Sequence, residues 1–149
     1  MQHGEAAPEE SDPARPLTPR GRLDVLKVSS VLENAGISSI PIRHSSKTRA
    51  RQTAQIIASA IGSENITSEE KNLNPNDPIR GVADEISSLS GDLMIVGHLP
   101  FLGKLASFLL TGSEDAAIVA FRMGGTVCLE RDERHWQVAW MVVPELIQY

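Results

Sequence analysis

The segment Asp92–Gly97 constrains the fold more than any other part of the sequence. It reads Asp-Leu-Met-Ile-Val-Gly, an apolar run bounded by Gly91 and Gly97. A strand this apolar has no polar face to turn toward water, which is typical of a parallel strand covered by helices on both sides. The run therefore predicts a buried strand in an α/β fold.

Four segments predict the amphipathic helices that would cover such a sheet. The first begins at Thr18-Pro19, a good N-cap followed by a proline suited to the first helical turn, and ends at Gly36. The predicted helices span residues 19–34, 48–61, 78–89 and 100–110. Residues 6–16, with three prolines and three acidic residues, predict an extended surface loop.

Shorter segments predict the remaining strands. The candidates are residues 39–44, residues 65–68, and two or three strands within 116–143, where 131–135 forms a polar hairpin turn. Pro41 lacks an N–H group and is therefore awkward in a central strand. Strands that alternate with helices predict a three-layer α/β/α sandwich with a mostly parallel central sheet, in one domain over residues 1–149.

Composition excludes several classes of partner. The chain carries 14 Lys and Arg against 19 Asp and Glu, a formal net charge of -5, which argues against nucleic acid or an anionic membrane. No segment approaches the ~20 apolar residues that cross a bilayer, and Met1–Glu5 is unlike a signal peptide. The one cysteine, Cys128, allows no internal disulfide and is expected to be a small buried residue. We expect a cytoplasmic protein.

Polar residues gather at three predicted strand–helix junctions, where open α/β sheets bind ligands. The junctions are Gln2-His3-Gly4, residues 45–49 and Val96-Gly97-His98. At the second, Lys47, Arg49 and Arg51 crowd the first turn of a helix, where the helix dipole disfavours cations. Either an anion binds at this helix N-terminus, or the cations are solvated or paired with Glu9, Glu10 and Asp12. No metal is expected, because the histidines lack ligand spacing and Cys128 is isolated.

Four motifs in this order resemble those of the histidine phosphatase superfamily (phosphoglycerate mutase-like). They are Gln2-His3-Gly4-Glu5-Ala6, Arg15-Pro16-Leu17-Thr18 with Gly21, the run Ser45–Ala54 (SSKTRARQTA), and Val96-Gly97-His98-Leu99-Pro100. Order and spacing are most similar to the small SixA-type protein phosphohistidine phosphatases. His3 needs a strand to position it, yet the first strand is largely absent from the sequence. Either residues precede Met1, or Met1–His3 is only the end of a strand.

The resemblance implies a role for each matching residue. His3 would be the nucleophile that forms a covalent phosphohistidine, while Arg15 and Arg49 would bind the phosphoryl oxygens. His98 would face the nucleophile and donate a hydrogen bond to an oxygen, better when protonated. Gln2 stands where the family has arginine and offers only neutral amide donors, so phosphate binding should weaken.

The resemblance also implies a substrate class. An imidazole leaving group, with a pKa near ~6.5, needs less acid catalysis than an alcohol. The sequence has no counterpart, between Leu73 and Leu89, of the glutamate motif of family members that act on sugar phosphates, although Glu5 and Asp12 remain possible acids. We therefore expect a metal-independent phosphatase that hydrolyses phosphohistidine on proteins such as phosphotransfer domains of signalling relays. The alternatives are a small-molecule phosphomonoesterase and a catalytically weak phosphate- or phosphohistidine-binding module.

The remaining histidines match none of the motifs. We expect His44 and His135 to be structural or surface residues.

Overall fold

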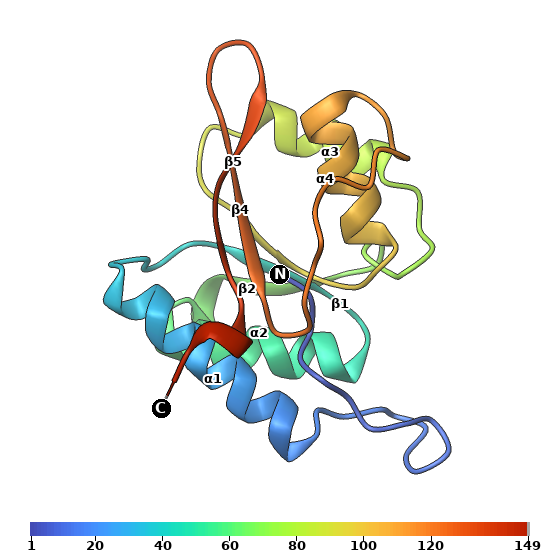
Figure 1. Cartoon of the computed structure of the whole chain (residues 1–149), viewed down its shortest axis with the longest axis vertical. Helices are drawn as coiled ribbons and strands as arrows, with labels where there is room; N and C mark the ends of the chain where they lie inside the picture. Colours follow the sequence, from blue (N-terminus) through green and yellow to red (C-terminus); the bar gives the residue numbers. More distant parts are fainter. Residues whose placement is uncertain (149) are drawn as a thin grey trace.

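The fold is built around a parallel sheet and a separate antiparallel hairpin. A computed structural model describes residues 1–148. The parallel sheet has the order β2-β1-β3, and β4 pairs with β5 in the hairpin. The strands are β1 (Ile42–Ser45), β2 (Thr67–Glu70), β3 (Met94–Val96), β4 (Thr126–Arg131) and β5 (Trp136–Val142). The predicted α/β class and the parallel pairing are confirmed (Figure 1).

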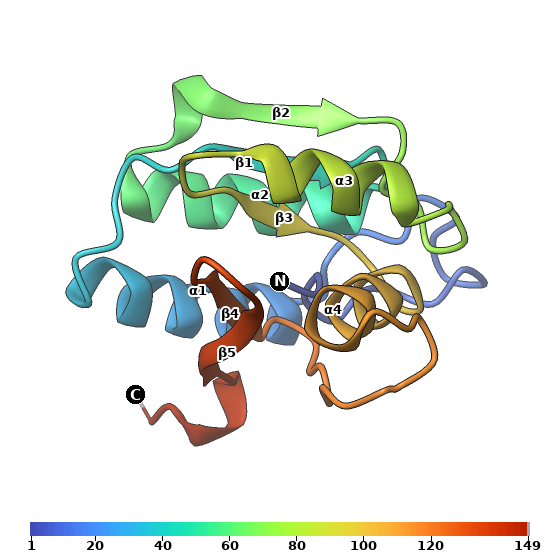
Figure 2. The ribbon, with the colours of Figure 1, turned by 90° about the horizontal axis from the view of Figure 1, so that it is seen from above.

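Helices pack in pairs on the two faces of the sheet. The helices are α1 (Pro19–Asn34), α2 (Thr48–Ile61), α3 (Arg80–Ser88) and α4 (Phe101–Thr111), with short 3-10 turns η1 (Glu64–Ile66) and η2 (Pro144–Leu146). One apolar cluster joins α1 and α2 to the sheet through Val28, Ile42 and Ile57, and a second joins α3 to α4 around Phe101 (Figures 1 and 2). Within residues 1–148, no helix is long and apolar enough to span a membrane.

The two helices nearest the N-terminus follow the predicted boundaries because their capping residues act as expected. The Thr18 hydroxyl accepts a hydrogen bond from the Gly21 N–H at 2.9 Å, which satisfies a free donor in the first turn of α1. Gly62 ends α2 in the left-handed region, at φ 68°. Both caps are local, so the sequence alone locates them.

Strand limits differ from the predictions by a few residues. β1 begins only at Ile42, because Ser39 takes a positive φ of 52° and Pro41 has no N–H to donate. β2 begins at Thr67 instead of Asn65, because η1 occupies the preceding residues. Residues 116–125 form no strand, so the C-terminal region holds two strands, and the predicted polar turn joins them.

Met1–His3 forms an extended segment between β3 and β4. Gln2 makes an isolated parallel bridge with Gly97, and its N–H donates to Gly125 O at 3.2 Å. The buried Met1 amino group donates to Ile95 O at 2.7 Å, and burial lowers its pKa to about 5. The bridge and these hydrogen bonds fix His3 beside β3.

A cleft of about 720 Å³ separates β3 from β4 next to Met1. Cys128 lines its wall and is only partly buried, so the expectation of a buried cysteine is wrong. Burial, then the charges of Glu130 and Asp92, raise the pKa of the Cys128 thiol. A thiol of this kind is a weak nucleophile at neutral pH.

Candidate active site

Two histidines from distant parts of the sequence face each other at the carboxyl end of the sheet. The backbone N–H of His3 donates to Gly97 O at 3.0 Å. This hydrogen bond places His3 beside the loop that follows β3 and carries His98. The two ring centroids lie 5.0 Å apart with the planes tilted by 54°. His3 is 9% exposed and His98 is 1% exposed. The pair predicted from separate motifs is therefore brought together in a largely buried position.

The hydrogen bonds of His3 leave one ring nitrogen available as a base. His3 Nδ1 lies 2.7 Å from Gly4 O, a carbonyl that can only accept, so Nδ1 carries the proton and donates. Arg49 Nε donates to His3 Nε2 at 3.3 Å, which requires a lone pair on Nε2. The ring thus presents an unprotonated nitrogen next to a guanidinium group.

Arginine charges surround this histidine pair. Arg49 lies in the first turn of α2, and its side chain reaches His3. Arg15 has a positive φ of 48° and donates from Nε to Ala7 O at 3.1 Å. The charge of Arg15 lowers the pKa of His3, Arg49 and His98, which places it in the same electrostatic environment. Two predicted anion ligands are therefore gathered at one site.

Both histidines are held neutral at pH 7. Burial is the largest cause and lowers the pKa of His3 to about 4, with further lowering by the Arg49 and Arg15 charges. Burial also lowers the pKa of His98 to about 3, and His3, Arg49, Lys47 and Arg15 add to the effect. A neutral His3 can act as a nucleophile, whereas the expected protonated form of His98 is disfavoured in the free protein.

Two hydroxyl groups at the site were given no role from the sequence. Ser45 Oγ lies 2.5 Å from His98 Nε2, at the end of β1. Thr53 Oγ1 accepts from the Gly4 N–H at 3.0 Å and donates to Arg49 O at 2.8 Å, so it ties the His3 loop to α2. Thr53 lies one helical turn after Arg49. This i, i+4 spacing places both residues on one face of the helix, and it is the feature of the sequence that could have indicated a role for Thr53 at the site.

The other residues considered from the sequence have local roles. Glu5 Oε1 accepts from the Thr18 hydroxyl at 2.6 Å, and Asp12 Oδ1 accepts from the Ala14 N–H at 3.0 Å. His44 is buried, and its Nδ1 atom is hydrogen-bonded to the backbone oxygen of Ser45 at 2.9 Å, as expected of a structural histidine. Across residues 1–148, no ion pair joins the cations of the α2 N-terminus to the acidic 9–12 loop.

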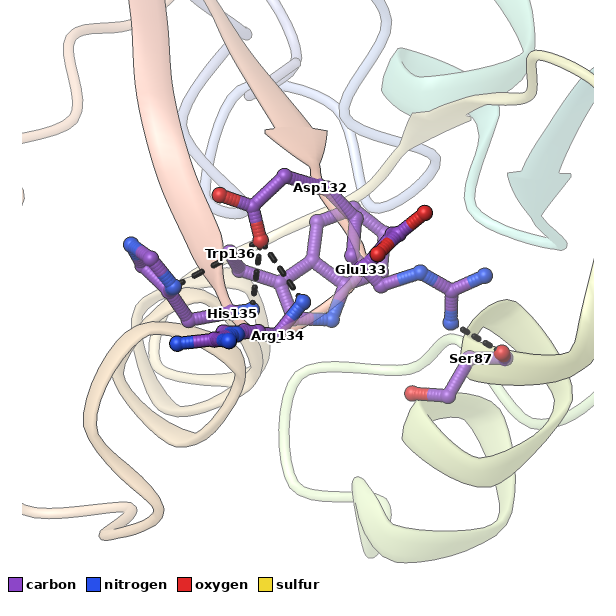
Figure 3. Close-up of a pocket in the computed structure, with 7 residues that line it drawn as sticks. Ser87, Asp132, Glu133, Arg134, His135 and Trp136 are labelled. Atoms are coloured by element: carbon purple, nitrogen blue, oxygen red, sulfur yellow. Dashed lines mark hydrogen bonds and ion pairs between the residues drawn. The ribbon is translucent and has the colours of Figure 1, made fainter.

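A separate hollow of about 630 Å³ lies at the turn between β4 and β5 (Figure 3). Within the turn, Asp132 Oδ1 accepts from the Arg134 and His135 N–H groups, and Arg131 donates to Ser87 O in α3. The six residues of β4 separate it from Gly125, next to Gln2, by about 20 Å. His135 therefore belongs to the exposed hairpin tip and not to the histidine site.

No group of three or more His, Cys, Asp or Glu side chains in residues 1–148 is arranged to hold a metal ion. The histidine site holds two imidazoles, two guanidinium groups and two hydroxyl groups. This set suits a tetrahedral oxyanion, because guanidinium forks match its oxygens and a neutral imidazole can attack its central atom.

The sequence profile of the histidine phosphatase superfamily (branch 1) matches residues 2–72, the segment that contains His3, Arg15, Ser45 and Arg49. The match places residues 2–72 in the histidine phosphatase superfamily. No curated protein shows significant sequence similarity to it.

Solved structures share the fold of this chain over nearly its full length. The protein histidine phosphatase SixA complexed with tungstate superposes with a TM-score of 0.84 at 23% identity, covering 97% of this chain and 94% of that one. A candidate phosphohistidine phosphatase SixA from Agrobacterium tumefaciens gives 0.77 at 22% identity, covering 97% and 95%. Phosphoserine phosphatase from Entamoeba histolytica in complex with 3-phosphoglyceric acid gives 0.69 at 15% identity, covering 94% and 93%.

Gln2 departs from the family motif, which has arginine at this position. Its side chain is half-buried, and its Oε1 atom has no hydrogen-bond partner within residues 1–148. A neutral amide at this position leaves Arg15 and Arg49 as the guanidinium groups next to the histidines. Gln2 therefore contributes hydrogen-bonding capacity but no charge.

Proposed function

We propose that the chain is a phosphatase that hydrolyses phosphohistidine on proteins, through a covalent phosphohistidine intermediate on His3. One observation carries the proposal: the Gly4 carbonyl fixes the ring proton on Nδ1, which leaves the Nε2 lone pair beside the Arg49 guanidinium. This arrangement supports a neutral imidazole nucleophile already next to a cation that can bind the phosphoryl oxygens.

In the first step, His3 Nε2 attacks phosphorus in line with the leaving group. The bond between phosphorus and the substrate imidazole breaks as the bond to Nε2 forms. The leaving nitrogen takes the electron pair, and the substrate ring, protonated on its other nitrogen, leaves as neutral imidazole. Arg15 and Arg49 stabilise the charge that spreads over the equatorial oxygens. In the second step, water attacks the phosphorus, releases inorganic phosphate and returns His3 to its starting form.

The surroundings of the site favour an imidazole leaving group. Such a group needs little acid catalysis, whereas an alcohol needs a carboxylic acid near the scissile bond. Glu5 and Asp12, the two acids considered, are both engaged in local hydrogen bonds. A structural neighbour described as a protein histidine phosphatase binds tungstate, an oxyanion, which supports oxyanion binding at this site.

The test is to incubate the protein with a phosphotransfer domain carrying labelled phosphohistidine, quench in alkali, and map the acid-labile label. We expect transient label on His3, its loss in His3→Ala, and no effect of His135→Asn, a matched exposed histidine. Undiminished turnover in His3→Ala would overturn the proposal. Faster turnover of phosphoserine or a sugar phosphate would indicate a phosphomonoesterase. Vanadate binding without any labelled protein would indicate a binding module.

A further inference from the structure

The Ser45 hydroxyl is buried against the second histidine of the site. Ser45 is fully buried, His98 is 1% exposed, and Ser45 Oγ lies 2.5 Å from His98 Nε2. The Lys47 N–H donates to the same oxygen at 3.3 Å. The hydroxyl is therefore held from two sides, by the backbone at the start of α2 and by the imidazole ring.

These contacts determine which partner donates. A serine hydroxyl has one proton to donate, and a buried donor needs an acceptor. Lys47 N is a donor, so the only acceptor within reach of Ser45 Oγ in residues 1–148 is His98 Nε2. The serine proton therefore points to Nε2, which must carry a lone pair.

The lone pair on Nε2 means that the ring proton of His98 lies on Nδ1. A neutral imidazole has one N–H, so a lone pair on Nε2 places the proton on Nδ1. His98 Nδ1 is buried and has no hydrogen-bond partner within residues 1–148. A buried N–H without an acceptor is unfavourable, and a phosphoryl oxygen bound between the histidines would satisfy it.

We propose that Ser45 is a positioning residue that holds His98 in the Nδ1–H tautomer, so that His98 donates a hydrogen bond to a bound phosphoryl oxygen. The identity of that acceptor rests on the proposed function, but the tautomer does not. Because His98 has a lowered pKa and one proton at neutral pH, the wrong tautomer would turn a lone pair toward the anion. Ser45 thus makes a neutral histidine useful as a donor.

The test reads the tautomer of His98 directly, in the full chain labelled with ¹⁵N-histidine. Long-range ¹H–¹⁵N spectra at pH 7 without substrate should show the proton on Nδ1 in the wild type. Ser45→Ala should give a mixture of tautomers and lower kcat about tenfold or more with a smaller change in KM, since it weakens one donor to the transition state. Ser45→Thr should restore both readouts, and exposed Ser46→Ala should change neither.

Two results would overturn the proposal. One is a proton on Nε2 of His98 in the wild type, which is decisive even if Ser45→Ala does not fold. The other is an unchanged tautomer and turnover in folded Ser45→Ala. If the tautomer is as proposed but phosphohistidine is not hydrolysed, the proposed function fails while the tautomer assignment stands, and inorganic phosphate should then shift the Nδ1 signal.

Discussion

Arg49 Nε lies 3.3 Å from His3 Nε2, and this contact joins the first turn of α2 to an N-terminal segment 46 residues away in sequence. The contact keeps a cation next to the nitrogen that would take up phosphorus. It also explains why an arginine occupies a helix N-terminus, where the dipole disfavours it: a bound oxyanion would reverse the balance. The proximity of these two side chains gives a sharp mutational prediction.

We expect Arg49→Ala to lower kcat by about 10²–10³, the loss found when one donor to a developing oxyanion is removed. Arg49→Lys should lose less, because it keeps the charge but not the planar fork. Arg51→Ala is the matched control, since Arg51 is exposed on the same helix and should change kcat little. Steady-state kinetics on the phosphoprotein measure this, and equal effects of the Arg49 and Arg51 variants would contradict it.

The second prediction concerns Gln2, where a substitution should increase the affinity for anions. We expect Gln2→Arg to tighten vanadate and phosphate inhibition, because charge-assisted hydrogen bonds are about twice as strong as neutral ones. Gln2→Met keeps the length of the side chain without its amide and should weaken inhibition. The inhibition constants should therefore rank Arg tighter than glutamine and glutamine tighter than Met. Identical constants for all three would show that residue 2 does not contact the anion.

Close backbone packing behind the site gives a third prediction. A Cβ on Gly21 would lie 2.1 Å from Glu5 O, a backbone atom held by the Thr18 N–H. We expect Gly21→Ala to lower the free energy of unfolding by about 2–3 kcal/mol or more, by overpacking. Gly81→Ala in α3 meets no atom within 4 Å and should raise it by up to ~1 kcal/mol. Urea unfolding of both variants checks the opposite signs.

How far the sequence predicts this molecule depends on the range of the interactions. α1 and α2 have the predicted limits, because Thr18 and Gly62 act on their own backbone neighbours. The meeting of His3 and His98 also follows from sequence, since both lie where strands end. The Ser45–His98 hydrogen bond does not, because it depends on side-chain orientation across two strands. The neutral state of His98 cannot be predicted from the sequence either, because it results from burial of the side chain, which no motif reveals.

The fourth prediction concerns the pH dependence of stability. The pKa of His3 falls from 6.5 to about 4, that of His98 from 6.5 to about 3, and that of the Met1 amino group from 8.0 to about 5. Below each ordinary pKa the unfolded chain binds a proton that the native state does not bind. The free energy of unfolding should therefore fall as the pH is lowered from about 8 to 5, most steeply below 6.5.

A comparison of His98→Asn with the wild type isolates the contribution of His98 to this pH dependence. One extra proton on the unfolded state corresponds to a slope of about 1.4 kcal/mol per pH unit, so His98→Asn should reduce the slope between pH 6.5 and 5 by up to that amount. Urea unfolding at pH 7.5, 6.5, 5.5 and 5 gives the free energy of unfolding of both proteins, and hence both slopes. If His98→Asn kept the wild-type slope, His98 would titrate near its ordinary pKa in the native state, and its role as a neutral donor would be wrong.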